Sequence, residues 1–135
     1  MFTVTREIHF CYGHRLLNYA GKCRHPHGHN GRAQVELGSP RLNRLGMVMD
    51  FEDIKERLQR WMDENLDHRM ILNRRDPLVA VFRKMGEPFY LLDGNPTAEN
   101  IAREIFRVAR RRGLPVKRVT VWETEKSSAG YSEKK

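Results

Sequence analysis

The sequence predicts an α+β fold in which an antiparallel sheet is covered on one face by two helices. Two strand-like segments come first, two amphipathic helical segments follow, and a strand-like segment lies near the end of the chain. The links at the front are of hairpin length, which favours antiparallel pairing. The 135 residues are 39% hydrophobic and 31% charged, which is typical of one soluble globular domain spanning residues 1–135.

The first half of the chain contains the two expected strands. Residues 2–11 alternate between apolar and polar side chains, although Arg6 interrupts the apolar side. Residues 18–26 are rich in glycine, histidine and basic residues and are expected to form a loop. Residues 32–37 alternate cleanly and are followed by Gly38-Ser39-Pro40, which predicts a half-buried strand that stops there.

The first helix is expected to begin after a short apolar piece at residues 47–49. Asp50 is suited to cap it, and apolar residues then recur at helical spacing to about Asn65. Residues 70–93 are mixed and interrupted by prolines, and residues 79–85 are compatible with a short helical turn.

The second helix is expected to start at Asn95-Pro96-Thr97. Gly113 and then Pro115 end it, because neither residue continues a helix well. Residues 116–124 form the last expected strand, and the polar tail beyond them is expected to fray.

The charge and cysteine content narrow the setting. Lys and Arg number 25 against 17 Asp and Glu, a formal charge of +8, which suits either nucleic acid or a substrate with several phosphates. Cys11 and Cys23 are too few for a disulfide framework, so both are expected to be free thiols in a reducing compartment. No apolar run is long enough to span a membrane and the N-terminus is charged, so a cytoplasmic location is expected.

Histidines cluster between the first two strands and predict a metal site. His27 and His29 enter a strand two residues apart, so their imidazoles should share a face. His14, expected just past the first strand, would complete a set of three if those strands pair. Three imidazoles with an open fourth position are typical of catalytic zinc. The alternative is two polar side chains on a solvated strand. His9, on the polar side of a strand, is more simply explained as solvated, and His25 as a loop residue whose backbone Pro26 restricts.

Cys23 lies four residues before His27, between Lys22 and Arg24. The two cations favour the thiolate, which suits a nucleophile or a general base. A second interpretation makes Cys23 the fourth ligand of a structural zinc site. An inert buried thiol fits poorly in a loop of this composition.

Two acidic positions are further candidates. Asp67 precedes His68 directly, and such a pair can relay protons, although a charge at the end of the first helix explains His68 as well. Glu123 ends the last strand on its apolar side and would need a partner there, such as the parallel N–H donors of an aminopyrimidine ring. The alternative is that Glu123 is exposed where the strand stops.

Six motifs occur in the order of a known family. They are His14, Cys23-Arg24-His25-Pro26-His27-Gly28-His29-Asn30, Gly46-Met47-Val48-Met49-Asp50-Phe51, Leu66-Asp67-His68, Asn95-Pro96-Thr97-Ala98-Glu99-Asn100 and Trp122-Glu123-Thr124. Over residues 2–131 the chain resembles the 6-pyruvoyl-tetrahydropterin synthase / 6-carboxy-tetrahydropterin synthase family. Its Cys-x-x-x-His-Gly-His spacing is similar to that of the carboxytetrahydropterin branch, which belongs to the queuosine pathway.

The resemblance implies roles for these residues. It places zinc on His14, His27 and His29, makes Cys23 the proton-abstracting base, makes His68 with Asp67 the second acid/base group, and makes Glu123 the pterin anchor, aided by Thr97 and Glu99. It further implies the T-fold, in which subunits assemble into barrels, commonly hexamers, with active sites at subunit interfaces. The chain departs from the usual pattern at Gly31, where an aromatic residue is common, and at Gly13, where alanine is usual; Cys11 and His25 are additional potential ligands.

The implied activity is that of a zinc-dependent carbon–oxygen and carbon–carbon lyase. It would convert 7,8-dihydroneopterin triphosphate to 6-carboxy-5,6,7,8-tetrahydropterin with release of triphosphate and acetaldehyde, a polyphosphate substrate that Lys22, Arg24, Arg74 and Arg75 would favour. The alternatives are the 6-pyruvoyl-tetrahydropterin synthase reaction, without side-chain cleavage, and a zinc-stabilised basic module that binds nucleic acid. The enzyme predicts a small pterin partner and no nucleic-acid or membrane partner.

Overall fold

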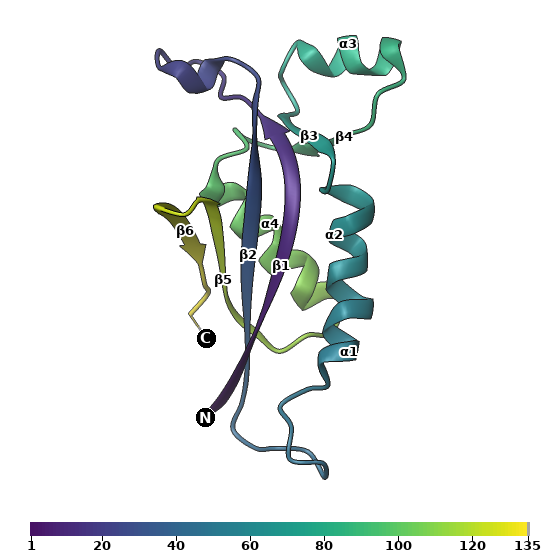
Figure 1. Ribbon diagram of the computed structural model, residues 1–135, viewed down its shortest axis with the longest axis vertical. Coiled ribbons are helices and arrows are strands. Elements are labelled where there is room, and N and C mark those ends of the chain that lie inside the picture. The colour runs from purple at the N-terminus through teal and green to yellow at the C-terminus, as the bar shows by residue number, and fades with distance from the viewer. Residues whose placement is uncertain (135) are drawn as a thin grey trace.

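A six-stranded sheet forms the body of the molecule in a computed structural model, which describes residues 1–134 (Figure 1). Its strands are β1 (Phe2–His14), β2 (His27–Ser39), β3 (Arg69–Asn73), β4 (Phe89–Leu92), β5 (Val116–Thr124) and β6 (Ser127–Tyr131), in the order β4-β3-β1-β2-β5-β6. Three neighbouring pairs are antiparallel: β1 with β2, β2 with β5, and β5 with β6.

The sheet is mixed, so the prediction of a purely antiparallel sheet is wrong. β3 runs parallel to β1 and to β4. The mixed segment 70–93 is the source, because it folds as strand, helix and strand, and parallel neighbours need such a crossover. β3 is only five residues long and its centre, Ile71 and Leu72, is fully buried, so it shows little of the alternation that marks a half-solvated strand.

The β1–β2 hairpin is longer than the alternation of the sequence predicts. The two strands pair without interruption from Phe2 opposite Ser39 to His14 opposite His27. Glycines and histidines at the far end look like loop composition, yet Tyr12 and His14 are buried there. Arg6 interrupts the apolar side of β1 without interrupting the strand. Its guanidinium donates to Oε1 of Gln59, in a helix that covers the sheet, at 3.1 Å.

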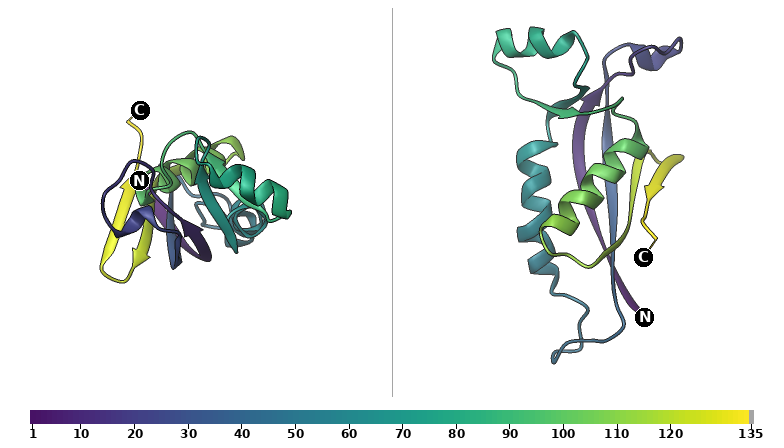
Figure 2. Two further views of the ribbon diagram at one scale, coloured as in Figure 1. Left: turned by 90° about the horizontal axis from the view of Figure 1, so that it is seen from above. Right: turned by 180° about the vertical axis from the view of Figure 1, so that it is seen from behind.

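The two predicted helices lie side by side on one face of the sheet (Figure 2). The first consists of α1 (Phe51–Ile54), a π-helical segment η2 (Lys55–Gln59) and α2 (Arg60–Asn65); the second is α4 (Ala98–Arg111). Asp50 caps the first as predicted, since its Oδ1 accepts from the Glu52 N–H at 2.9 Å. Thr97 caps α4, its Oγ1 accepting from the Asn100 N–H.

A third helix, α3 (Leu78–Met85), joins β3 to β4 and lies beyond the end of the sheet (Figure 1). The sequence analysis predicted two helices and only a short helical turn at residues 79–85, so it did not predict this helix in full. A short 3-10 turn, η1 (Lys22–Arg24), lies in the loop between β1 and β2.

The core lies between the sheet and the two covering helices. Its fully buried side chains include Ile8, Phe10, Val35, Leu37, Val119 and Val121 from the sheet, Ile54, Leu58 and Met62 from the first helix, and Ile101, Ile105 and Phe106 from α4. These are the apolar positions of the alternating and helical patterns, which is why those elements were predictable.

The expected frayed tail is wrong, since residues 127–131 form β6 along β5. The segment is made mainly of serine, alanine and glycine and therefore carries little hydrophobic signal. Tyr131 holds it in place, because its ring packs edge-on against Phe106 with centroids 5.1 Å apart. Within residues 1–134, no helix is both long and apolar enough to cross a membrane.

Candidate metal centre and active site

Three histidines converge at the end of the β1–β2 hairpin. The register places His14 opposite His27 and Tyr12 opposite His29, so all three imidazoles lie on the face of the sheet that carries the helices. Their ring centroids are 4.6 to 5.0 Å apart, and one ligand nitrogen from each lies within 4.8 Å of the others. The sequence predicted that His14 would lie just past the first strand. In the structure it is the last residue of β1.

Backbone carbonyls set the tautomers of two of these rings. His14 Nδ1 lies 2.6 Å from the Pro96 carbonyl oxygen, and His27 Nδ1 lies 2.8 Å from that of His25. A carbonyl only accepts, so each Nδ1 carries the proton and each Nε2 keeps its lone pair. Burial is the main cause that lowers the pKa of His14, which favours the neutral ring.

The imidazole nitrogens that have no hydrogen-bond partner are suited to bind a metal ion. Within residues 1–134, the Nε2 atoms of His14 and His29 are buried without a hydrogen-bond partner. An unsatisfied buried polar atom costs about 1–3 kcal/mol, and a divalent cation would satisfy both. Neutral imidazole nitrogens are ligands that zinc prefers, and three of them leave a coordination position for a substrate.

A cavity of about 340 Å³ beside the histidines collects most of the predicted site. It is lined by His14, Leu16, Tyr19, Cys23, Thr97, Ala98, Glu99, Glu123 and residues 127–129. Cys23 is half-buried and comes from η1, whose loop is tied back by a 2.8 Å hydrogen bond from the Leu16 N–H to the Cys23 carbonyl. In the described chain the metal-binding group contains the three histidines and not Cys23.

Glu123 faces the metal-binding nitrogens. Its two carboxylate oxygens lie 4.0 Å from His14 Nε2 and 4.0 Å from His29 Nε2, and its side chain is 27% exposed. The carboxylate is therefore directed inward from the end of β5 and is not the freely exposed group of the alternative interpretation. A carboxylate in this position can accept parallel N–H groups from a ligand in the cavity.

Asn95 is a residue whose role sequence reasoning missed. Its side chain accepts from the Leu17 N–H and donates to the Leu17 carbonyl, both at 3.0 Å, and accepts from Asn73 Nδ2 at 3.1 Å. The residue after it, Pro96, accepts from His14. One segment thus supports both a metal ligand and the loop that carries Cys23; the sequence marked it as a helix start and as a family motif, but not as a support.

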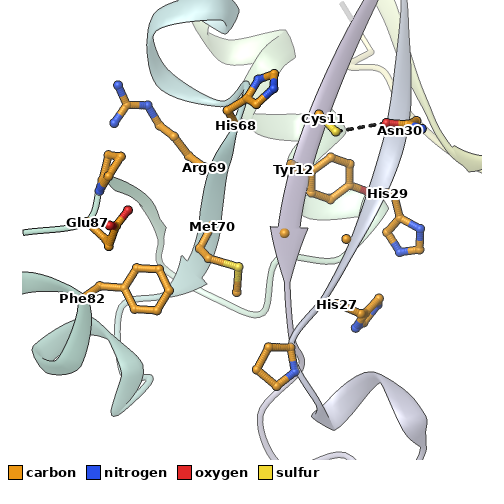
Figure 3. Close-up of a pocket in the computed structure, with 14 residues that line it drawn as sticks. Cys11, Tyr12, His27, His29, Asn30, His68, Arg69, Met70, Phe82 and Glu87 are labelled. Atoms are coloured by element: carbon orange, nitrogen blue, oxygen red, sulfur yellow. Dashed lines mark hydrogen bonds between the residues drawn. The ribbon is translucent and has the colours of Figure 1, made fainter. Parts of the chain in front are cut away.

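Asp67 and His68 lie elsewhere. Asp67 Oδ1 accepts from the Cys11 N–H and Oδ2 from His68 Nδ1, both at 2.8 Å, while the His68 side chain is 80% exposed. His68 lines a separate cavity of about 690 Å³ that also borders His27 and His29 but not Cys23 or Glu123. Figure 3 shows His68 on the β3 side of β1 and the two histidines on the β2 side. One chain therefore does not bring the pair together with Cys23.

Tyr12 is a second residue that sequence reasoning missed. A Cβ atom on Gly31 would lie 2.7 Å from Tyr12 Cε1, so the tyrosine ring occupies the space above that glycine. Burial and then the Glu123 carboxylate raise the pKa of Tyr12, so its phenol is neutral beside His14 and His29.

Gly13 has a packing role on the opposite face of the sheet. A Cβ atom there would lie 2.3 Å from Met70 Sδ, so the Met70 side chain occupies the space beside this glycine. Cys11 is on the same face and donates to Asn30 Oδ1 at 3.0 Å (Figure 3), and the ring of His25 is exposed; neither belongs to the metal-binding group of the described chain.

Known proteins have sequences similar to that of this chain. A family model described as 6-pyruvoyl tetrahydropterin synthase matches residues 3–134. Proteins named 6-carboxy-5,6,7,8-tetrahydropterin synthase are similar: that of Rickettsia conorii is 38% identical over 104 residues, covering 76% of this chain and 75% of the relative. That of Haemophilus influenzae is 30% identical over 141 residues, covering 98% of this chain and all of the relative.

Solved structures agree. An uncharacterized protein from Wolinella succinogenes superposes with a TM-score of 0.85 at 30% identity, covering 98% of both chains. The 6-pyruvoyl tetrahydropterin synthase of Caenorhabditis elegans superposes with a TM-score of 0.73 at 26% identity, covering 98% of this chain and 96% of that one. The chain is a member of the 6-pyruvoyl tetrahydropterin synthase family of enzymes, with the T-fold of that family.

Proposed function

We propose that this enzyme converts 7,8-dihydroneopterin triphosphate and water to 6-carboxy-5,6,7,8-tetrahydropterin, triphosphate and acetaldehyde, a lyase reaction of queuosine biosynthesis in the cytoplasm. Relatives at 30 to 39% identity carry the name 6-carboxy-5,6,7,8-tetrahydropterin synthase. The observation that carries the proposal is the cavity in which a thiol, a carboxylate and a histidine with a free Nε2 meet.

Zinc on His14, His27 and His29 would supply Lewis-acid polarisation of the substrate's side-chain oxygens. The rest of the site binds the pterin ring. The Glu123 carboxylate accepts the amino and ring N–H groups, and this fixes which end of the ring faces the histidines. Thr97 Oγ1 already accepts from Asn100, so its hydroxyl hydrogen is available to a ligand; the Glu99 carboxylate offers a further acceptor in the same cavity.

Cys23 acts as the base in the proposed reaction. Its thiolate removes a proton from the substrate side chain, and the sulfur lines the cavity without belonging to the metal-binding group of residues 1–134. Asp67 holds the proton on His68 Nδ1, which leaves Nε2 free to take or return a second proton.

Assembly of several copies would bring His68 to the substrate. The ring is 80% exposed and its cavity does not include Cys23, which supports a site that another chain completes. We therefore place the complete site at the interface between subunits of a homo-oligomer, a hexamer in our proposal, with His68 and Asp67 of one subunit facing Cys23 of the next.

The main alternative is the 6-pyruvoyl reaction, which eliminates triphosphate without cleaving the carbon side chain. The name of the matching family model and that of the Caenorhabditis elegans structure favour it. The nucleic-acid-binding module is less well supported, because it needs a closed structural zinc site, and the metal-binding group of the described chain has three side chains rather than four.

The test is direct. The purified protein is loaded with zinc and incubated with 7,8-dihydroneopterin triphosphate, and the products are identified by mass. Acetaldehyde with 6-carboxytetrahydropterin supports the proposal, and 6-pyruvoyltetrahydropterin supports the alternative. Substrate that remains intact with zinc-loaded protein would refute both.

A further inference from the structure

We propose that Arg24 and Arg75 form a polyphosphate-binding subsite beside the active-site cavity. The proposal rests on the proposed function, because it names the residues that hold the phosphate end of the substrate. It depends on the shape and the charge of a second cavity.

This second cavity lies next to the first. It has a volume of about 1040 Å³ and is lined by residues 15–20, Arg24, His25, Asn73, Arg75, Pro77 and Asp93. Leu16 and Tyr19 line both cavities, so the two share a wall. Arg24 directly follows Cys23, which lines the active-site cavity. The phosphate end of a ligand whose reacting carbon lies at Cys23 would therefore be next to the second cavity.

Ion pairs show which arginines are available. Arg15 directs its Nε and one terminal nitrogen to the two oxygens of Asp76, at 2.8 and 2.5 Å, and the Asp76 side chain is fully buried. The charge of Arg15 is therefore already matched. Arg74 pairs with Asp93 at 2.9 Å and lines a different cavity.

Arg24 and Arg75 remain. Within residues 1–134, no carboxylate oxygen lies within 4.0 Å of either guanidinium. Arg24 donates from one terminal nitrogen to the Ala20 carbonyl at 2.7 Å, which positions the group and leaves its other donors free. The backbone N–H of Arg75 donates to Asn73 Oδ1 at 3.0 Å, which anchors the base of that side chain.

Two unmatched guanidinium groups on one concave surface suit a chain of phosphates. Each can bind phosphate oxygens with two parallel N–H groups, and a polyphosphate offers more than one phosphate group for such contacts. Asp93 also lines this cavity, and although Arg74 pairs with it, its exposed carboxylate adds negative charge that opposes phosphate binding. The subsite should therefore respond in opposite directions when the arginines and when Asp93 lose their charge.

The experiment measures binding of inorganic tripolyphosphate to the full chain by calorimetry, without any pterin. We expect Arg24→Ala and Arg75→Ala each to raise Kd about tenfold. Asp93→Asn should lower Kd, and Arg44→Ala, which changes an exposed arginine outside both cavities, should leave it unchanged. Orthophosphate should bind more weakly than tripolyphosphate, and circular dichroism verifies that each variant is folded.

Three results would overturn the proposal: unchanged Kd in both arginine variants, equal weakening in Arg44→Ala, or tighter arginine-dependent binding of a single-stranded oligonucleotide than of tripolyphosphate. Failure of the proposed function looks different. Arginine-dependent tripolyphosphate binding without turnover of dihydroneopterin triphosphate would leave the subsite standing. Turnover with a KM that neither arginine variant changes would leave the function standing without the subsite.

Discussion

The ring of His14 is held by the carbonyl of Pro96, which accepts from Nδ1 at 2.6 Å. The preceding residue, Asn95, holds both backbone groups of Leu17. A metal ligand and the cysteine loop thus share one support, although His14 and Asn95 are 81 positions apart in the sequence. Mutation of the groups that orient metal ligands typically changes metal affinity or activity by roughly 10- to 100-fold.

Replacement of Asn95 tests this support. We expect Asn95→Ala to weaken zinc binding about tenfold and to lower kcat, because Leu17 and Asn73 lose their partners and the segment before α4 shifts. Zinc affinity is measured by competition with a chelator. Asn43→Ala, which removes a turn-stabilising amide from a loop distant from the cavity, is the control, and unchanged zinc affinity in Asn95→Ala would contradict the role.

Mixing of variants tests the shared site. Cys23→Ala should keep its zinc and its fold but lose turnover, and His68→Ala should do the same. When the two inactive proteins are dissociated and reassembled together, about a quarter of the sites should combine an intact Cys23 with an intact His68. Product formation by the mixture is the measurement. Loss of zinc in Cys23→Ala would show that Cys23 is a metal ligand. An inactive mixture would show that Cys23 and the Asp67–His68 pair act within one chain.

Glu123→Gln tests the pterin anchor. The substitution keeps the shape but turns one accepting oxygen into a donor, so we expect Kd for 7,8-dihydroneopterin to rise about thirtyfold. Zinc affinity should change much less, because the carboxylate oxygens lie 4.0 Å from the histidine nitrogens. Glu125→Gln, an exposed position outside this cavity, is the matched control. Equal pterin binding by Glu123→Gln and the parent chain would rule out the anchor.

The packing of Tyr12 over Gly31 predicts a non-additive pair. Gly31→Ala should cost about 1–3 kcal/mol, because its Cβ would lie 2.7 Å from the Tyr12 ring and 3.2 Å from that of Phe10. Tyr12→Ala removes the nearer clash, so the double variant should lose less stability than the sum of the single variants. Urea unfolding of all four proteins measures this; single costs that add to within about 0.5 kcal/mol would contradict the contact.

The buried Asp76 predicts a dependence of stability on pH. Burial alone would raise the pKa of Asp76, but hydrogen bonds from Arg15 and from the Leu78 N–H hold it below the ordinary value of 3.8. The folded state therefore binds fewer protons than the unfolded chain, and the stabilisation is present above pH 3.8 and disappears as pH falls through the folded value.

We expect Asp76→Asn to lose about 2–3 kcal/mol of unfolding free energy at pH 7, because Arg15 loses a charged partner. The difference from the parent chain should shrink steadily below pH 3.8. Denaturant unfolding at several pH values measures it, with the exposed Asp63→Asn as control. A difference that is constant from pH 7 to pH 3 would show that the charge of Asp76 contributes nothing.

The sequence predicted most of the elements near this site but few of their contacts. Alternation and helical spacing located five elements, because an apolar stripe reports which face is buried. β6 was not predicted, because its serines, alanine and glycine carry no such stripe. β3 was not predicted, because both of its faces are covered. The histidine group was predictable, since strand alternation fixes which side chains share a face. The distance of His68 from Cys23 and the role of Asn95 were not, because they depend on contacts between residues far apart in the chain.

The uninterrupted pairing of β1 with β2 restricts how this protein can change in length. His14 lies opposite His27 at the last rung of the hairpin, and side chains alternate with a period of two. Loss or gain of one residue within β1 would turn the His14 ring to the other side of the sheet, whereas a two-residue change would preserve its direction. Natural variation in the length of this strand is therefore expected in even steps, or with a compensating bulge.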